Sequence, residues 1–121
     1  MSARKEFEPE ASSVRAVRLF VGEALPPWVR REDVVLVASE LATNVVRHAR
    51  TDFRVDLAVE QRRMRLEVSD GSSIVPAVED LADNQHGLRM IEALSDRWGI
   101  ESTPTGKTVW VEFDELSVPN G

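Results

Sequence analysis

The most informative segment of this chain is Ser39-Glu40-Leu41-Ala42-Thr43-Asn44-Val45-Val46-Arg47-His48-Ala49. It closes a mainly apolar run that starts at Val34 and predicts a helix over residues 31–49. Side chains four residues apart lie one above the other on a helix, so the Glu40 carboxylate and the Asn44 carboxamide share a face. A magnesium nucleotide needs such a pair, with one oxygen ligand for the metal and one base beside the terminal phosphate.

The surroundings of this pair leave two interpretations open. At about 100° per residue, Arg47 lies on the same stripe as Glu40 and Asn44. The opposite half of the helix is apolar and holds Val34, Val35, Ala38, Leu41, Ala42, Val45 and Val46. The polar stripe is therefore the solvent face of an amphipathic helix, or, because Leu36 and Val37 lie beside it, the wall of a ligand pocket.

Composition limits the classes of protein that fit. The chain has 121 residues, of which 42% are hydrophobic and 30% charged, so we expect one globular domain over residues 1–121 with flexible ends at 1–6 and 117–121. The net charge of -6 argues against a nucleic-acid surface. The absence of cysteine excludes thiolate chemistry. No apolar run approaches the roughly 18 residues of a membrane span, and no signal peptide is visible, so we expect a cytoplasmic protein without membrane contact.

Periodicity predicts the remaining elements. A first helix should start after Ser12 or Ser13, either of which can cap it, and stop at Pro26-Pro27. Alternation over 53–59 and 64–69 predicts a hairpin closed by a polar turn at 60–63. A loop over 71–86, a helix over 87–95, a strand around 98–100, a turn at 103–106 and a strand over 109–113 complete the chain. This order predicts an α+β two-layer sandwich, a mainly antiparallel mixed sheet with helices on one face.

Two candidate sites follow the hairpin. Asp70 ends a strand and can accept from the exocyclic amine of a base, while Gly71 allows close backbone approach; an ordinary Asp-Gly turn explains them equally. Gly87 and Leu88 open the next helix, where unpaired N–H groups bind phosphate well. The alternative is a glycine that merely ends a flexible loop.

A last candidate site precedes the final strand. Gly106 and Thr108 flank Lys107, and the threonine hydroxyl could hold a base through water. The alternative is a hairpin turn in which the lysine charge keeps the strand edge from pairing with another chain.

Taken in order, these motifs resemble the GHKL ATP-binding superfamily, which has the Bergerat fold. More narrowly, the chain is similar to the anti-sigma regulatory factors, small serine/threonine kinases of bacterial partner-switching systems. The motifs are residues 39–49, Val68-Ser69-Asp70, residues 87–99 and Gly106-Lys107-Thr108-Val109-Trp110, and residues 14–21 also fit. The resemblance covers nearly the whole chain.

The resemblance implies that ATP and Mg²⁺ are the cofactors. It makes Glu40 the general base or the group that orients the acceptor hydroxyl, and Asn44 the Mg²⁺ ligand. Asp70 would take the adenine amine, with Thr108 assisting. The candidate cofactor-binding residues are Asn44, Arg47, His48, Asp70, Gly71, Gly87, Leu88, Gly106 and Thr108. Two positions depart from the family pattern, because Ser72 and Gln85 stand where glycines are usual.

Three functions are compatible with this sequence. The first is an anti-sigma factor that binds ATP, acts on a sigma factor or an anti-sigma antagonist, phosphorylates a serine of the antagonist and forms a homodimer. The second is an interaction module of the same fold without catalysis, which Ser72 and Gln85 favour. The third is a detached catalytic domain of a sensor kinase, which the lack of a phosphoacceptor helix pair disfavours.

Overall fold

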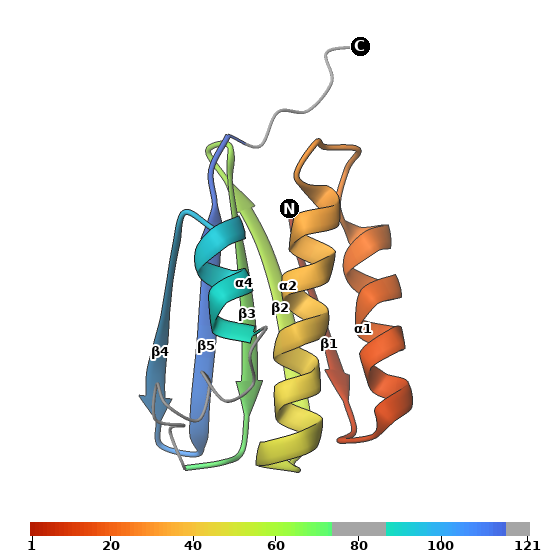
Figure 1. Cartoon of the computed structure of the whole chain (residues 1–121), viewed down its shortest axis with the longest axis vertical. Coiled ribbons are helices and arrows are strands. Elements are labelled where there is room, and N and C mark those ends of the chain that lie inside the picture. Colours follow the sequence, from red (N-terminus) through yellow and green to blue (C-terminus); the bar gives the residue numbers. More distant parts are fainter. Residues whose placement is uncertain (74–86, 116–121) are drawn as a thin grey trace.

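The computed structural model of the chain describes residues 1–73 and 87–115. The elements are β1 (Ser2–Phe7), α1 (Ala11–Ala24), α2 (Arg31–Asn44), the π-helix η1 (Val45–Ala49), β2 (Phe53–Glu60), β3 (Arg63–Asp70), α4 (Gly87–Leu94), β4 (Arg97–Thr103) and β5 (Gly106–Phe113). Figure 1 shows α1, α2 and α4 side by side over one face of a single sheet. The predicted two-layer α+β fold is confirmed. Most of the predicted loop, residues 74–86, and the predicted flexible end at 117–121 lie outside the described residues.

The sheet has the strand order β1-β2-β3-β5-β4. Every pairing among the described strands is antiparallel, where we expected a mainly antiparallel mixed sheet. The predicted hairpin is present as β2 and β3, and its turn residues Gln61 and Arg62 both have positive φ, at 48° and 68°. Two left-handed residues in a row match the twist of the flanking strands, which explains why the turn is short.

The expectation of a flexible N-terminus over residues 1–6 is wrong, because this segment forms the edge strand β1. It pairs along its whole length with β2. Arg4 reaches Asp56 of β2 at 2.6 Å, and the Phe7 ring stacks on Phe53 with centroids 5.4 Å apart. An edge strand with only one buried side chain shows no alternation in its sequence, so its stability comes from backbone pairing and from Phe7.

The helices differ from expectation at their ends. Neither Ser12 nor Ser13 caps α1, whose N-cap residue is Glu10 and makes no side-chain cap hydrogen bond. The predicted helix over 31–49 has the expected extent, but its last turn, η1, is π-helical and ends at Arg50 in the left-handed region, with φ 54°. No helix in the described part of the chain is long and apolar enough to span a membrane.

The core lies between the helices and the sheet. Its largest fully buried side chains come from α1, α2, β2, β3 and β5, and they are Val17, Val21, Val34, Val37, Val55, Leu57, Met64, Leu66, Val68, Val111 and Phe113. Residues at alternate positions of β2 and β3 face this core, as the period of two predicts. The residues between them along these strands, many of which are charged, lie on the opposite face of the sheet.

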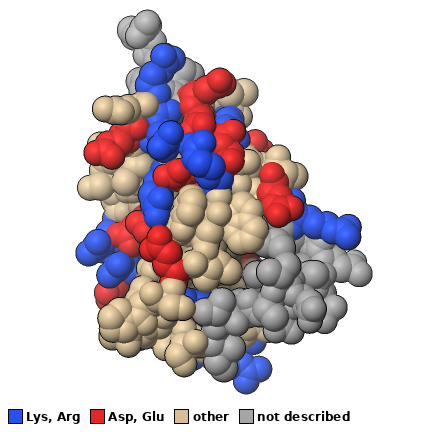
Figure 2. Space-filling view, turned by 90° about the vertical axis from the view of Figure 1, so that its left-hand side faces the viewer, with Lys and Arg blue, Asp and Glu red and all other residues tan. Residues whose placement is uncertain are grey.

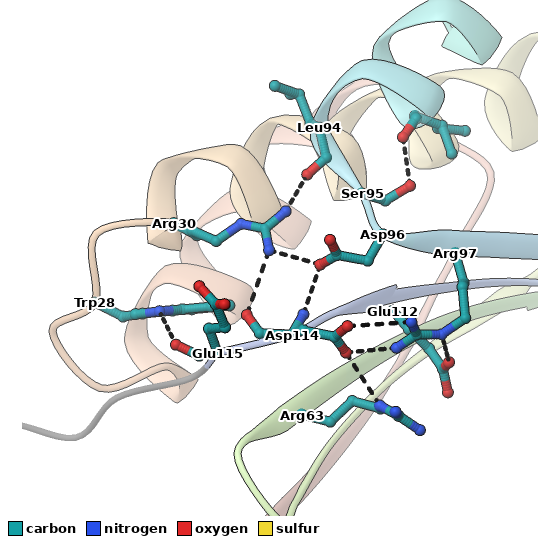
Figure 3. Close-up of polar contacts among 11 residues, drawn as sticks. Trp28, Arg30, Arg63, Leu94, Ser95, Asp96, Arg97, Glu112, Asp114 and Glu115 are labelled. Atoms are coloured by element: carbon teal, nitrogen blue, oxygen red, sulfur yellow. Dashed lines mark hydrogen bonds and ion pairs between the residues drawn. The ribbon is translucent and has the colours of Figure 1, made fainter.

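A polar clasp of Arg30, Asp96 and Asp114 joins three segments that are distant in the sequence (Figure 3). Arg30 Nη1 donates to Asp96 Oδ2 at 2.6 Å, and its Nη2 donates to the carbonyl of Leu94 at the end of α4. Asp96 Oδ2 also accepts from the Asp114 backbone N–H at 2.7 Å. The clasp therefore fixes the end of α4 against the end of β5 and the turn before α2.

Arginines extend the clasp onto the sheet. Arg97 bonds both Asp114 and Glu112, and Arg63 reaches Asp114 at 3.2 Å. Figure 2 shows positive and negative side chains interleaved over the upper part of this side of the molecule, above a mainly uncharged area. Interleaved networks of this kind contribute more than isolated surface pairs, whose contribution is small.

Asp96 should make stability sensitive to acid. The Asp114 backbone N–H and the Arg30 guanidinium lower the pKa of the Asp96 carboxyl below its ordinary value. A carboxyl whose pKa is lower in the folded state stabilises above its unfolded pKa of about 3.9, and this stabilisation is lost as pH falls through the folded pKa. Below about pH 4, we expect the free energy of unfolding of Asp96→Asn to fall less than that of the wild type. Urea denaturation at neutral and acidic pH measures this, with the exposed Glu101→Gln as a control that leaves the acid profile unchanged.

Candidate functional site

The predicted site residues gather at one end of the molecule. The C-terminal half of α2, the last residues of β3 and the first residues of β5 all lie at the lower end in Figure 1, and the N-terminus of α4 points toward that end. These are the elements that carry Glu40, Asn44, Asp70 and Gly87. Segments far apart in the sequence therefore converge on one region, as a shared ligand site requires.

Glu40 and Asn44 occupy the last turns of α2 and are both half-buried. This helix lies between α1 and α4 (Figure 1). Of the apolar residues beside the stripe, Val37 is fully buried, whereas Leu36 is 42% exposed. The described residues give the Glu40 carboxylate no hydrogen-bonding or ionic partner. The pair is thus neither on a fully solvated face nor in the core.

Arg47 and His48 lie beyond this pair in η1, and both are exposed. The projection at 100° per residue, which placed Arg47 on the stripe of Glu40, does not apply to a π-helical turn. Such turns are rare and occur frequently at functional sites. Here the regular α-helix changes to the π-turn directly after Asn44, so the two basic residues follow the Glu40–Asn44 pair without continuing its α-helical spacing.

Asp70 is paired in this structure with a residue that the sequence analysis did not select, Lys107. The Lys107 Nζ atom lies 3.0 Å from Asp70 Oδ1, and the two side chains are only 8% and 3% exposed. Oδ1 also accepts from the backbone N–H of Ser72 at 2.9 Å. No donor among the described residues bonds the second oxygen, Oδ2. The carboxylate is therefore anchored through Oδ1.

Thr108 is not brought to the Asp70 carboxylate. In the β3–β5 register, Asp70 faces Lys107, and Ser69 faces Thr108. Opposed residues share a face of the sheet and neighbours along a strand do not, so Thr108 and Asp70 point to opposite faces. The Thr108 hydroxyl instead bonds the Ser69 hydroxyl at 2.8 Å. The sequence indicates the position of Lys107, because Lys107 is an even number of residues before Val109, Val111 and Phe113. The alternation of these three residues marks the core face of the strand.

Gly71 and Gly106 allow two chain segments to meet beside Asp70. The Gly71 N–H donates to Thr51 Oγ1 at 2.8 Å. A Cβ atom at Gly106 would stand 1.9 Å from the Asp70 carbonyl oxygen and 2.9 Å from the Gly71 Cα. Both contacts are with backbone, which cannot rotate away, so Gly106 is required for the approach of β5 to the end of β3.

Gly106→Ala is accordingly expected to be destabilising. We expect a loss of about 1–3 kcal/mol in the free energy of unfolding, because the added methyl must push apart two paired strands. Thermal denaturation followed by circular dichroism measures the loss. Gly22→Ala is the matched control, since a Cβ there would meet only side-chain atoms at 3.6 Å or more. Equal melting temperatures for the wild type and Gly106→Ala would contradict the close approach.

Gly87 and Leu88 are the first two residues of α4. Their backbone N–H groups belong to the unpaired donors of a helix start, which suit an anion. Gln85 and His86 lie outside the described residues.

The donor set fits magnesium only in combination with a nucleotide. Within residues 1–73 and 87–115, no three carboxylate or imidazole groups are clustered so that they could hold a metal ion. Mg²⁺ is commonly bound by one or two protein oxygens together with substrate phosphates and water. The Asn44 amide oxygen would be the protein ligand in such an arrangement.

Comparison with known proteins identifies the family. The model of the histidine kinase-like ATPase domain matches residues 3–113. Among solved structures, the crystal structure of the RsbU and RsbW domains of Rv1364c from Mycobacterium tuberculosis is similar, with a TM-score of 0.74 and 22% sequence identity. The match covers 94% of this chain but 32% of that one, so the chain spans about a third of the length of its structural relative.

A search of curated proteins gives no match. The family match nevertheless covers both layers of the fold and every described element that carries a candidate site residue. The sheet and the described helices over one of its faces agree with the fold of the structural relative. The chain belongs to the histidine kinase-like ATPase domain family, as its resemblance to the GHKL superfamily predicted.

Proposed function

We propose that this chain is an anti-sigma regulatory factor that binds Mg-ATP and transfers the γ-phosphoryl group to a serine of an antagonist protein. The observation that carries the proposal is the half-buried Glu40–Asn44 pair, set at the same end of the molecule as the strand-end carboxylate of Asp70. Family membership supports nucleotide binding. The proposed role as an anti-sigma regulatory factor is supported by the sequence resemblance to that family and by the RsbW-containing structural neighbour.

Each residue has a defined task in this proposal. Asp70 accepts from the base through Oδ2, while Lys107 and the Ser72 N–H hold Oδ1 in place. The Asn44 amide oxygen ligates Mg²⁺, which when bound neutralises phosphate charge. Glu40 accepts the proton of the attacking serine hydroxyl or orients it. Unpaired N–H groups at the start of α4, and the exposed Arg47 and His48, face the phosphate oxygens.

The partners are a sigma factor, an anti-sigma antagonist or both, and the regulator acts as a cytoplasmic homodimer. A pull-down from the native host with the full chain as bait identifies the partner. Incubation of the recovered partner with γ-labelled ATP and the chain then tests transfer. Label on a partner serine supports the proposal, and label on a histidine, or none on any partner, would reject the kinase part.

A second function is favoured by one specific contact. Lys107 already bonds one oxygen of Asp70, so the charge of this buried carboxylate is balanced without a nucleotide. In this alternative the fold serves as an interaction module without catalysis. Titration with Mg-ATP separates the two, because clear binding that Asp70→Asn abolishes would count against a module without a nucleotide site.

A further inference from the structure

The strand β4 is an edge of the sheet, and its outer side has no partner among the described strands. In the strand order β1-β2-β3-β5-β4 it pairs only with β5. Figure 1 shows β4 at the outer side of the sheet, and Figure 2 faces this side of the molecule. An edge strand presents a row of backbone N–H and C=O groups that can pair with a strand of another chain.

The sequence of β4 is complementary to itself in one antiparallel register. Directly opposed residues of an antiparallel pair share a face of the sheet, so in a symmetric pair of β4 strands one residue lies opposite its own copy. With Gly99 at that position, Arg97 lies opposite Glu101 of the second copy. Trp98 then lies opposite Ile100, and two-fold symmetry makes each pair occur twice. Opposite charges and aromatic side chains beside β-branched ones are pairs that stabilise antiparallel strands.

The charged side chains of this register lie on the face of the sheet that the helices leave open. Trp98 packs against the core, so Arg97 and Glu101, which alternate with it, point to the other face. Glu101 is exposed and has no hydrogen-bonding or ionic partner within the described part of the chain. Arg97 bonds carboxylates of its own chain, and its side chain is still 41% exposed. In the symmetric register, each Glu101 gains a cationic partner that it lacks in a single chain.

The other edge strand, β1, is not complementary to itself. Its residues Arg4, Lys5 and Glu6 are consecutive exposed charges. A symmetric antiparallel pair centred on any of the three places that charge opposite its own copy, and like charges directly opposed are destabilising. Charged side chains, lysine above all, commonly protect edge strands from pairing with other chains. Of the two edges, β4 is therefore the one that suits a second copy.

We propose that two copies of this chain associate through their β4 strands, in the antiparallel register centred on Gly99. The two five-stranded sheets then form one continuous sheet, and the helices of both copies cover the same face of it. The inference rests on the proposed function in one respect, namely that the regulator is a homodimer. It adds the surface, the symmetry and the side chains that fix the register.

Sedimentation velocity of the full chain over a range of concentrations tests the proposal. We expect the wild type to dimerise, and Glu101→Arg to raise the dissociation constant of the dimer at least about tenfold, because two attractive pairs become two Arg–Arg pairs. Glu6→Arg, the same change of charge on the edge strand β1, is the matched control and should leave the constant unchanged. A Glu101→Arg dimer as stable as that of the wild type would overturn the proposed interface, while the homodimer itself would stand.

A second measurement uses only the wild type. Hydrogen exchange is compared at concentrations above and below the dissociation constant of the dimer. We expect the amides of residues 97–101 that point away from β5 to be protected in the dimer and to exchange rapidly after dilution, with no change in β1. Equal exchange of residues 97–101 in both samples would overturn the interface. A chain that stays monomeric at millimolar concentration would overturn both the interface and the homodimer, whereas nucleotide binding and phosphoryl transfer are measured separately.

Discussion

Glu40→Gln is expected to lower phosphoryl transfer to the antagonist about 100- to 10,000-fold, the range that general-base catalysis supplies. The amide keeps the size of the carboxylate but cannot accept the proton of the serine hydroxyl. Glu40 is half-buried on α2 and has no partner among the described residues, so the fold should tolerate the change. Initial rates with γ-labelled ATP and the purified antagonist measure the effect.

The affinity for Mg-ATP separates a catalytic role of Glu40 from a binding role. A general base should leave the dissociation constant nearly unchanged, because the loss is confined to the transition state. Glu32→Gln, an exposed substitution in the first turn of the same helix, is the matched control and should transfer at the wild-type rate. Full transfer activity in Glu40→Gln would remove Glu40 from the mechanism.

Lys107→Met is expected to lower the free energy of unfolding by about 3–5 kcal/mol, because it leaves the Asp70 charge buried without its partner. The two side chains are 8% and 3% exposed, so water cannot replace the lost contact. Urea denaturation gives the free energy. Lys5→Met, at the exposed lysine of β1, should cause a far smaller loss.

A double-mutant cycle isolates the pair itself. In Asp70→Asn with Lys107→Met, neither charge remains, and the amide oxygen of the introduced asparagine can still accept from the Ser72 N–H. We expect this double variant to recover most of the stability that Lys107→Met loses. If the double variant lost as much stability as the two single variants together, the groups would not interact, and this would contradict the contact.

The sequence predicts those parts of this fold that depend on local periodicity. Alternation gave β2 and β3 because every second residue in them is buried. The helical stripe gave α2, since its core face is continuous over several turns. β1 was not predicted, because an edge strand with the single buried residue Phe7 has no periodic signal. Its formation depends on pairing with β2, about fifty residues further along the chain.

The site was predictable where its residues lie on one element. Glu40 and Asn44 follow from helical spacing, whereas Arg47 lies in a π-turn that the spacing does not reveal. The partner of Asp70 depends on strand register, which places Lys107 opposite Asp70 and Thr108 opposite Ser69. Contacts that combine distant segments, such as the clasp around Arg30, carry no local signal in the sequence.

We propose that a nucleotide binds between the end of α2 and the Asp70 end of the sheet. Titration of ¹⁵N-labelled chain with Mg-ATP, followed through the backbone amide signals, tests it most directly. We predict saturable shifts in residues 40–50, 69–73 and 106–109, and an affinity at least about tenfold weaker in Asn44→Ala, which removes the proposed metal ligand. Binding that shifts only residues elsewhere, or no shift at millimolar Mg-ATP, would contradict the claim.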